Sequence, residues 1–380
     1  MVIAVPKESA PGERRVALTN DGVKTLVADG FEVLVRYEAG YGAAVGNTAY
    51  ELAGARIVPE GDPLEESADL TLCVNVDDAL IERLKPGSAV MGFLNPAGRL
   101  TSMARLAERN ITAISMELVP RISRAQAMDA LSSMSTVAGY KSVVMAAAAI
   151  PKFFPMLMTA AGSVPPARVL VIGAGVAGLQ AIATARRLGA IVEAFDVRPS
   201  VKEQVESLGA KFVDWGLTAE EAEDSGGYAK EVASDTHAHE LRIIGERVPK
   251  CDVVITTALI PGKPAPVLIT EEMVRGMVRG SVIVDLAAVA GGNCEVTKPG
   301  ETIDFHGVTI IGLLDIASSM AVHASRMYSK NITAFVKSMS KGGVLTIDLE
   351  DEVVAGSLVT HDGKVVHAPT RLAFEKGETS

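Results

Sequence analysis

The segment Gly173-Ala174-Gly175-Val176-Ala177-Gly178 has the spacing of a turn that binds the pyrophosphate of a dinucleotide. In such a turn Gly173 permits a tight bend, Gly175 lets the backbone approach the phosphates, and Gly178 lets a helix pack on a strand. The helix that follows would direct its unpaired N–H groups and its positive dipole end at the phosphates. Asp196, roughly twenty residues on, is placed to accept both ribose hydroxyls.

The residues near Asp196 favour NAD over NADP. The carboxylate would accept hydrogen bonds from the ribose and repel a 2′-phosphate. Arg198 argues the other way, because a guanidinium can neutralise that phosphate. NADP therefore stays open, as does a βαβ unit that binds no nucleotide and uses its glycines only for packing.

A second polar set lies in the stretch PRISRAQAMDALSS, from Pro120 to Ser133, which combines two guanidiniums, an amide, a carboxylate and hydroxyl groups. A helix beginning at about Ser123 would carry on one polar face Gln126, Asp129 and Ser133. The opposite, apolar face would carry Ala127, Ala130, Leu131 and Met134. One face would then belong to a core and the other could line a cleft. The alternative is an ordinary helix start with Ser123 as N-cap.

The other candidate residues are less informative. His237 and His239 fall in a polar stretch between Glu220 and Arg242 that we expect to be a mobile loop. No pair among the six histidines has the helical spacing of metal ligands, and no metal site is expected. Asn293 and Cys294 follow an expected strand end, where a doubly wound fold gathers ligands, but a plain turn explains them equally well. No GxSxG elbow predicts a serine hydrolase.

The elements around these residues predict the fold class. Strand-like apolar runs alternate with helical patterns, which indicates two Rossmann-like α/β domains with mainly parallel sheets. The second is expected to be a doubly wound, dinucleotide-binding fold. The expected boundaries are residues 1–135 plus 328–380 for the first domain and residues 136–327 for the second.

Three segments connect or extend these domains. The longest helical pattern, Leu131 to Phe154, is expected to cross between them. The stretch PMLMTAAGSVPPARV, with Gly162-Ser163 between two extended runs, predicts a hairpin that packs on a second subunit or on its own domain. The stretch LTIDLEDEVVAGSLVTHDGKVV predicts a closing β-hairpin near the C-terminus.

Composition excludes several classes of protein. With 36 basic and 46 acidic residues among 380, the net charge is -10, and no basic cluster predicts binding to nucleic acid or to an anionic membrane surface. The three cysteines lack CxxC spacing, as expected in a reducing cytoplasm without disulfides or zinc. The most apolar window, Ser142 to Ile150, is too short for a span of about twenty residues, and the N-terminus lacks a signal-peptide pattern, so a soluble chain is expected.

Several longer stretches carry a family resemblance. They are MELVPRISRAQAMDALSSMSTVAGYKS, TAAGSVPPARVLVIGAGVAGLQAIATARRLGA, DVRPSVKEQVESLGAKF, GGYAKE, VITTALIPGKPAPVLIT and SVIVDLAAVAGGNC. Together they resemble the NAD(H)-binding component, domain I, of proton-translocating NAD(P) transhydrogenases, over essentially the whole chain. The resemblance implies direct hydride transfer from NADH to NADP⁺ on a partner, coupled to proton translocation. It also implies a homodimer docked on the cytoplasmic face of membrane-embedded and NADP(H)-binding subunits.

The resemblance also implies roles for individual residues. Those around the nicotinamide and its ribose would be Arg121, Gln126, Asp129 and Ser132, with Gln126 reaching toward the partner's nucleotide and with Ile122, Ser123, Ala127 and Met128 in the same cofactor-binding stretch. The pyrophosphate would meet Ala174, Gly175 and Val176, and the adenosine ribose would meet Asp196, Val197 and Arg198. Gly227 and Tyr228 would belong to the mobile loop, where Val232 replaces a frequent methionine, and Leu259 would pack on the cofactor.

Alanine dehydrogenases share the opening PKE…RRVALT and the nucleotide domain, and Arg15 matches the position that holds a substrate carboxylate there. That family also uses a lysine and a histidine at two strand ends. The corresponding stretches here, Cys73 in CVNV and Phe93 in FLN, contain neither, so amino-acid oxidation would lack its general acid and base. An amino-acid dehydrogenase and a non-catalytic NAD(H)-sensing module remain as alternative functions.

Overall fold

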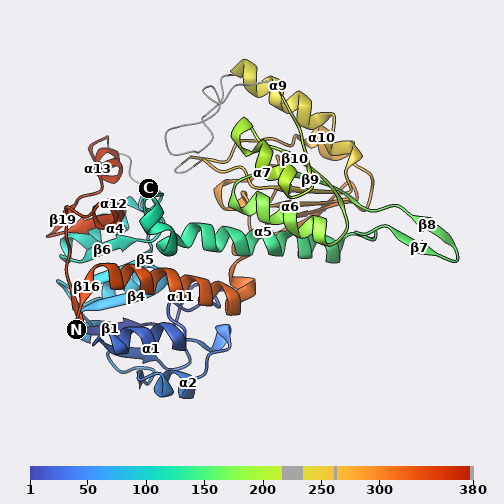
Figure 1. Ribbon diagram of the computed structural model, residues 1–380. Helices are drawn as coiled ribbons and strands as arrows, with labels where there is room; N and C mark the ends of the chain where they lie inside the picture. The colour runs from blue at the N-terminus through green and yellow to red at the C-terminus, as the bar shows by residue number, and fades with distance from the viewer. Residues whose placement is uncertain (216–233, 261–262, 377–380) are drawn as a thin grey trace. The chain divides into compact units, whose positions relative to one another are not determined.

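The computed structural model describes residues 1–215, 234–260 and 263–376 (Figure 1). The chain forms two compact units, Met1–Met134 with Ala317–Ser380, and Ser135–Ile316. The first division lies inside helix α5 (Ala130–Ala149). The sequence placed the return to the first unit at residue 328, whereas the structure keeps all of α11 (Ala321–Ser338) in that unit. The reason is that hydroxyls along α11 accept backbone N–H groups from the N-terminal segment, including that of Val16.

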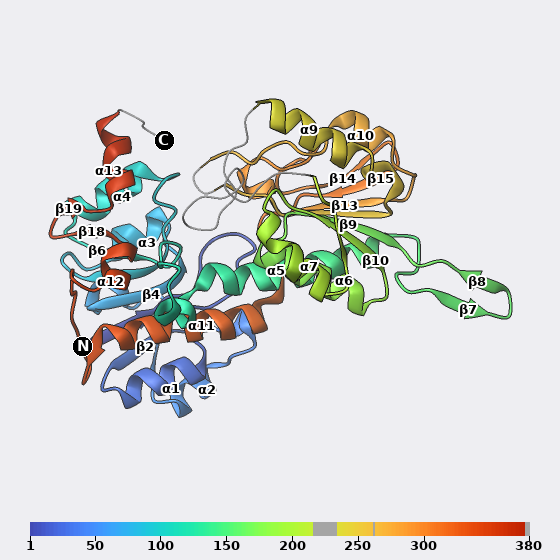
Figure 2. The same ribbon diagram turned by 45° about the horizontal axis from the view of Figure 1, so that its top comes forward.

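The first unit is built on an eight-stranded sheet in the order β19-β18-β6-β5-β4-β1-β2-β3. Its six N-terminal strands are parallel, as expected from the alternating pattern, and β18 and β19 pair antiparallel at one edge. Figure 2 shows β18 and β19 beside β6. The strands are β1 (Val2–Val5), β2 (Glu32–Arg36), β3 (Arg56–Val58), β4 (Leu70–Asn75), β5 (Ala89–Phe93), β6 (Thr112–Ser115), β18 (Leu358–His361) and β19 (Lys364–Val365).

Helices of the first unit cover this sheet. They are α1 (Asn20–Ala28), α2 (Asn47–Leu52), α3 (Asp78–Arg83), α4 (Leu100–Glu108), α11, α12 (Glu352–Ser357) and α13 (Ala368–Glu375). The predicted C-terminal hairpin is confirmed only for β18 and β19, because α12 occupies the middle of that stretch. The Asp351 carboxylate caps α12 by accepting the N–H groups of Val353 and Val354. A separate small hairpin pairs β16 (Ser340–Lys341) with β17 (Val344–Leu345).

The second unit contains a seven-stranded sheet in the order β11-β10-β9-β12-β13-β15-β14. Its first six strands are parallel and in the order 3-2-1-4-5-6 of a doubly wound fold, and β14 is antiparallel at the edge. The strands are β9 (Arg168–Ile172), β10 (Ile191–Phe195), β11 (Lys211–Phe212), β12 (Val253–Thr256), β13 (Val282–Asp285), β14 (Thr302–Phe305) and β15 (Val308–Ile311). The sequence order therefore reverses between β9 and β12, where such folds bind dinucleotides.

Two apolar layers enclose this sheet. Alternate strand residues such as Val171 and Val253 pack with α6 (Val176–Arg187), α7 (Lys202–Ser207) and the second half of α5. Leu170 and Val254 face the opposite layer, which contains α9 (Ser234–Gly245) and α10 (Glu271–Arg275). Because successive side chains of a strand point to opposite faces, each strand contributes apolar residues to both layers.

Helix α5 packs closely against the start of α6 within the second unit. A Cβ built on Gly139 would lie only 2.1 Å from the Ala177 carbonyl oxygen. This contact requires glycine, because no side chain fits between the two backbones. The long helix therefore buttresses the helix that follows the glycine-rich turn.

The predicted hairpin is present in the second unit as β7 (Leu157–Thr159) paired antiparallel with β8 (Gly162–Val164). Figures 1 and 2 show it extending away from the sheet of its own unit. Its turn lies at Ala160-Ala161, two residues before the predicted Gly162-Ser163, which belong to the second strand. Met158 is 83% exposed, but packing on a second subunit remains a proposal.

The predicted mobile loop was wrong over its second half, because α9 covers the stretch from Ser234 through His237 and His239. His237 contacts the buried Glu240 carboxylate at 3.0 Å, and His239 contacts the Trp215 carbonyl oxygen at 3.3 Å. The His237–Glu240 contact has the i, i+3 spacing of a helix, which the polar composition of the stretch concealed, whereas the His239 contact joins α9 to a residue far away in sequence. The remaining loop residues, with Gly227, Tyr228 and Val232, lie outside the described residues.

Candidate dinucleotide-binding site

The glycine-rich turn joins β9 to α6 as the sequence predicts. Gly173 has φ of +94°, a conformation that L side chains rarely adopt, and its N–H donates to the Phe195 carbonyl oxygen at 2.8 Å. A Cβ built on Gly178 would lie 1.8 Å from the Gly173 carbonyl oxygen. Both positions are therefore closed to any side chain, and together they fix the start of α6 against the end of β9.

Gly175 differs from these two glycines. A Cβ there would meet, within 4 Å in the described residues, only the Arg198 guanidinium at 4.0 Å, and its φ of -73° is ordinary. Gly175 is the N-cap of α6, and no side chain caps the helix. The open space and the uncapped N–H groups of a twelve-residue helix fit a phosphate. Val176, the first helical residue, is 39% exposed beside this space, whereas Ala174 is buried.

Asp196 follows β10 and is 5% exposed. Its Oδ2 accepts the Ala174 N–H at 2.6 Å, which ties it to the glycine-rich turn. The Arg198 guanidinium donates to both of its oxygens at 2.9 Å, and the Arg198 N–H donates to Oδ1 at 2.9 Å. Arg198, which could have neutralised a 2′-phosphate, is thus paired with Asp196, whose charge would repel that phosphate.

The neighbouring Val197 carbonyl oxygen accepts the Trp215 Nε1–H at 3.2 Å. Trp215 is the one tryptophan in the sequence, and its ring packs edge-on against Phe195 with centroids 5.6 Å apart. It was not among the residues expected at the site, since an isolated tryptophan carries no spacing signal. Its position beside the adenosine end of the proposed site makes it an intrinsic fluorescence probe.

Leu259 lies beyond β12 and is 45% exposed. Thr257, which was not predicted from the sequence, donates its hydroxyl to the Gly173 carbonyl oxygen at 3.1 Å. The pair Thr256-Thr257 at the end of an apolar run was the sequence feature that could have identified it. Asn293 is fully buried and bonded to backbone, which supports a turn rather than direct ligation. Cys294 is buried too, and burial raises the pKa of its thiol to about 11.

The stretch from Arg121 to Ser132 belongs to the first unit and is not one helix, so the predicted faces were wrong. Ser123–Met128 forms a short 3₁₀ helix, η3, and Asp129 is non-helical before α5 begins at Ala130. Asp129 ends η3 and caps α5, since its carboxylate accepts the Ser132 N–H at 2.8 Å and the Ser132 hydroxyl at 2.6 Å. Ser123 itself caps no helix, because the N-cap of η3 is Ile122.

Exposure in this stretch also departs from the predicted stripe. Ala130 and Met134 are buried, but Ala127 and Leu131 are exposed. Met128 is buried, which identifies it as core rather than as an evident ligand contact. The polar side chains that are exposed are Arg121, Ser123, Arg124 and Gln126. The Arg124 guanidinium forms two 2.9 Å bonds with Asp351, and the Asn331 amide donates to the Ala127 carbonyl oxygen.

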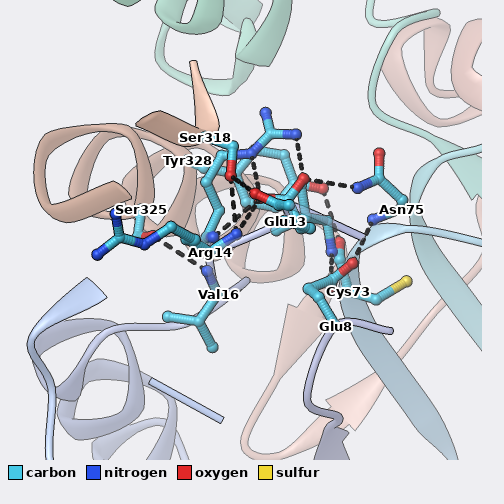
Figure 3. A network of polar contacts seen from close by, with 12 residues as sticks. Glu8, Glu13, Arg14, Val16, Cys73, Asn75, Ser318, Ser325 and Tyr328 are labelled. Carbon is cyan, nitrogen blue, oxygen red and sulfur yellow. Dashed lines mark hydrogen bonds and ion pairs between the residues drawn. The ribbon is translucent and has the colours of Figure 1, made fainter. Parts of the chain in front are cut away.

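A buried polar network surrounds the Glu13 carboxylate in the first unit (Figure 3). The Glu13 carboxylate accepts Nε and a terminal nitrogen of Arg15 at 2.8 and 2.5 Å, and it accepts the Asn75 amide at 2.9 Å. Glu8 accepts the N–H groups of Val74 and Asn75 at 2.6 and 3.1 Å. The Arg15 charge is therefore already neutralised within the protein.

The same network joins the N-terminal segment to α11 (Figure 3). The Val16 N–H donates to the Ser325 hydroxyl of α11 at 3.0 Å, and the Arg14 N–H donates to Ser318, just before α11, at 2.7 Å. The Tyr328 hydroxyl of α11 donates to the Cys73 carbonyl oxygen of β4 at 2.8 Å. Cys73 is 1% exposed, and burial holds the pKa of its thiol well above its usual range. Phe93 packs on Tyr328 with ring centroids 5.4 Å apart. These side chains serve the core of the first unit.

Burial makes Glu8 a source of pH-dependent stability. Removal from water raises its pKa from 4.5 to about 7, against the opposing effect of its two backbone hydrogen bonds. Because the pKa is higher in the folded state, this contribution is present below pH 4.5 and is lost as pH rises through about 7. Glutamine can replace only one of the two acceptor oxygens but never ionises, so we expect the Tm of Glu8→Gln relative to that of wild type to be higher at pH 8 than at pH 5. Thermal unfolding followed by circular dichroism measures this difference.

The exposed Glu66→Gln is the matched control, expected to shift Tm equally at both pH values. A Tm difference between Glu8→Gln and wild type that stays constant from pH 5 to pH 8 contradicts the role of Glu8.

In the part of the chain that the structure describes, His, Cys, Asp and Glu side chains form no group of three or more that could hold a metal ion. None of the described helices combines the length and apolar character needed to cross a bilayer.

Comparisons with known proteins agree with this architecture. Residues 4–138 match the family described as alanine dehydrogenase/PNT, N-terminal domain, and residues 142–368 match the C-terminal domain of the same family. The chain is 48% identical over 378 residues to the first part of NAD(P) transhydrogenase subunit alpha of Rhodospirillum rubrum, covering 97% of this chain and 98% of the relative. It is 32% identical to an alanine dehydrogenase of Halomonas elongata, covering 98% of this chain and 97% of the relative.

The crystal structure of a transhydrogenase from Sinorhizobium meliloti matches with a TM-score of 0.86 and 43% identity, covering 96% of this chain and all 100% of the other. Family models for both halves, full-length identity and a shared fold agree. The chain belongs to the alanine dehydrogenase/PNT family and is homologous to the first part of NAD(P) transhydrogenase subunit alpha.

Proposed function

We propose that this chain is the NAD(H)-binding subunit of a proton-translocating NAD(P) transhydrogenase. The observation that carries the proposal is the contrast within the glycine-rich turn. Gly173 is closed by its positive φ and by the Thr257 hydroxyl, and Gly178 is closed by the Gly173 carbonyl oxygen. Among the described residues, in contrast, Gly175 opens on free space at the start of α6, which no side chain caps. The full-length similarity to a protein named as the first part of a transhydrogenase subunit alpha supports the specific activity.

In this function the bound NADH supplies a hydride directly to NADP⁺ on a partner subunit. The chain therefore contributes binding and orientation rather than a general acid or base. Orientation alone is worth up to roughly 7–11 kcal/mol. The N–H groups of α6 would bind the pyrophosphate, Asp196 would accept the adenosine ribose, and Leu259 would pack against the other half of the cofactor. Arg121, Gln126, Asp129 and Ser132 would serve the nicotinamide, as the resemblance implies.

The partners in this proposal are a second copy of the chain and the membrane-embedded and NADP(H)-binding subunits. The exposed β7–β8 hairpin supports a contact with the second copy. The assembly would place this chain at the cytoplasmic face of the cell membrane, coupled through its partners to proton movement.

The first test mixes the purified chain with an NADP(H)-binding partner subunit and follows hydride transfer from NADH to an NADP analogue. Transfer in the mixture, and not with either protein alone, is the expected result. Consumption of NADH by the chain alone with pyruvate and ammonia would replace the proposal with an amino-acid dehydrogenase. Binding of NADH with no transfer in the mixture would instead identify a sensing module.

Gln126 provides a sharper test, because it is exposed on η3. We expect Gln126→Ala to lower hydride transfer in the mixture about 100-fold by loss of orientation, with NADH affinity nearly unchanged. Stopped-flow transfer rates and NADH titration separate these two effects. Arg124→Gln is the control, since the Arg124 side chain is held by Asp351 and transfer should persist. Normal turnover in Gln126→Ala would remove the role assigned to Gln126.

A further inference from the structure

Asn293 joins two loops at the carboxyl ends of neighbouring strands. Its side chain is fully buried, its Oδ1 accepts the Ala258 N–H at 3.0 Å, and its Nδ2 donates to the carbonyl oxygens of Ala258 and Pro266 at 2.9 and 2.8 Å. The backbone adds to these contacts, because the Asn293 carbonyl oxygen accepts the Leu268 N–H at 2.8 Å. All three side-chain bonds therefore go to the loop that follows β12.

The turn that carries Asn293 is itself held from the sheet. Asp285, at the end of β13, is fully buried and accepts the Ala287 N–H, the Cys294 N–H and the Thr256 and Thr297 hydroxyls at 2.7 to 3.1 Å. Gly292 completes the turn with φ of +100°. The turn that carries Asn293 is thus fixed by hydrogen bonds to the end of β13, so the Asn293 side chain can hold the neighbouring loop in place.

The loop so held carries Leu259, which is 45% exposed directly after Ala258. Strand order reverses between β9 and β12, and Asp196 lies on the β10 side of that point. A dinucleotide that crosses there with its adenosine ribose at Asp196 must direct its other half over β12 and β13. With the cofactor bound in this direction, Leu259 would lie on the side of its nicotinamide half.

We propose that Asn293 is a positioning residue that holds Leu259 against the nicotinamide half of NAD(H). The inference rests on the proposed function, because it requires the chain to bind NAD(H). Asn293 has no contact with the cofactor in this role and acts through the backbone of residue 258. Its amide is suited to this task, because the oxygen accepts one backbone N–H and the nitrogen donates to two backbone carbonyl oxygens. An apolar side chain would leave these backbone groups without hydrogen bonds.

The test compares the binding of NADH with that of ADP, which has the pyrophosphate but lacks the nicotinamide half. We expect Asn293→Ala to raise the Kd for NADH about tenfold while the Kd for ADP stays within about twofold. Val308→Ala is the matched control for general destabilisation, because Val308 is fully buried in β15 among core residues of the second unit. It should lower Tm without changing the ratio of the two Kd values.

A double-mutant cycle tests whether Asn293 acts through Leu259. Leu259→Ala, at an exposed site, should fold and by itself reproduce the selective loss of NADH affinity. In that background Asn293→Ala should change the NADH to ADP ratio no further. Fully additive effects, an equal loss of both ligands in Asn293→Ala, or unchanged NADH binding in Leu259→Ala would each overturn the inference. Failure of the wild-type chain to bind either ligand would instead refute the proposed function.

Discussion

A single methyl group at Gly178 is expected to abolish NADH binding and to destabilise the second unit. In Gly178→Ala the new Cβ would lie 1.8 Å from the Gly173 carbonyl oxygen, so α6 must move away from β9. Alanine gains about 1 kcal/mol over glycine in a helix. That gain is outweighed by an overpacking cost of about 3 kcal/mol or more. Thermal unfolding and NADH titration should show a lowered Tm and no saturable binding.

Gly175→Ala is the matched partner of this variant. Its methyl group would meet only the Arg198 guanidinium, at 4.0 Å, among the described residues. We therefore expect an unchanged Tm together with a loss of NADH affinity, since the methyl occupies the space proposed for the pyrophosphate. Normal NADH binding by Gly175→Ala would contradict the placement of the phosphates at this turn.

Asp196→Ala is expected to weaken NADH binding roughly 10- to 150-fold, because a charged acceptor contributes about 1.5 to 3 kcal/mol through its hydrogen bonds. The carboxylate also holds the Ala174 N–H and the Arg198 guanidinium, so its loss frees a positive charge at the same place. Affinity for NADPH relative to NADH should therefore rise. Quenching of Trp215 emission by each nucleotide measures both constants.

Adding Arg198→Ala to Asp196→Ala separates the weaker binding of NADH from the relative gain in NADPH affinity. The double variant should lose the relative gain in NADPH affinity but keep the weakened NADH binding. An unchanged NADH affinity in Asp196→Ala would contradict the proposed contact of Asp196 with the ribose. The Tm of the ligand-free variants is the control, because a lowered Tm would show that the glycine-rich turn itself was disrupted.

Much of the second unit could be predicted from local patterns. Short apolar runs identified β9 and β10, and the glycine spacing identified the turn, because backbone conformation and strand period depend on residues close in sequence. The same reasoning failed between Ser123 and Ser132. An apolar period there suits a continuous helix, but the Asp129 carboxylate instead takes the Ser132 N–H and hydroxyl and starts a new helix.

The sequence by itself determined the fold class, the glycine-rich turn, the acid after β10 and the resemblance to one family. Only the tertiary structure decided which partners these groups have. Asn293 meets Ala258 because sheet order brings the ends of β12 and β13 together, and Tyr328 meets Cys73 because α11 contacts β4 at that point. Local periodicity marks which residues are buried but does not encode which strand lies beside which. Long-range packing therefore gave Asn293 its hydrogen-bond partners in the loop after β12, which no pattern within its own turn could indicate. The pair of Arg198 with Asp196 is local in sequence, but which of its possible roles the guanidinium takes was visible only in the structure.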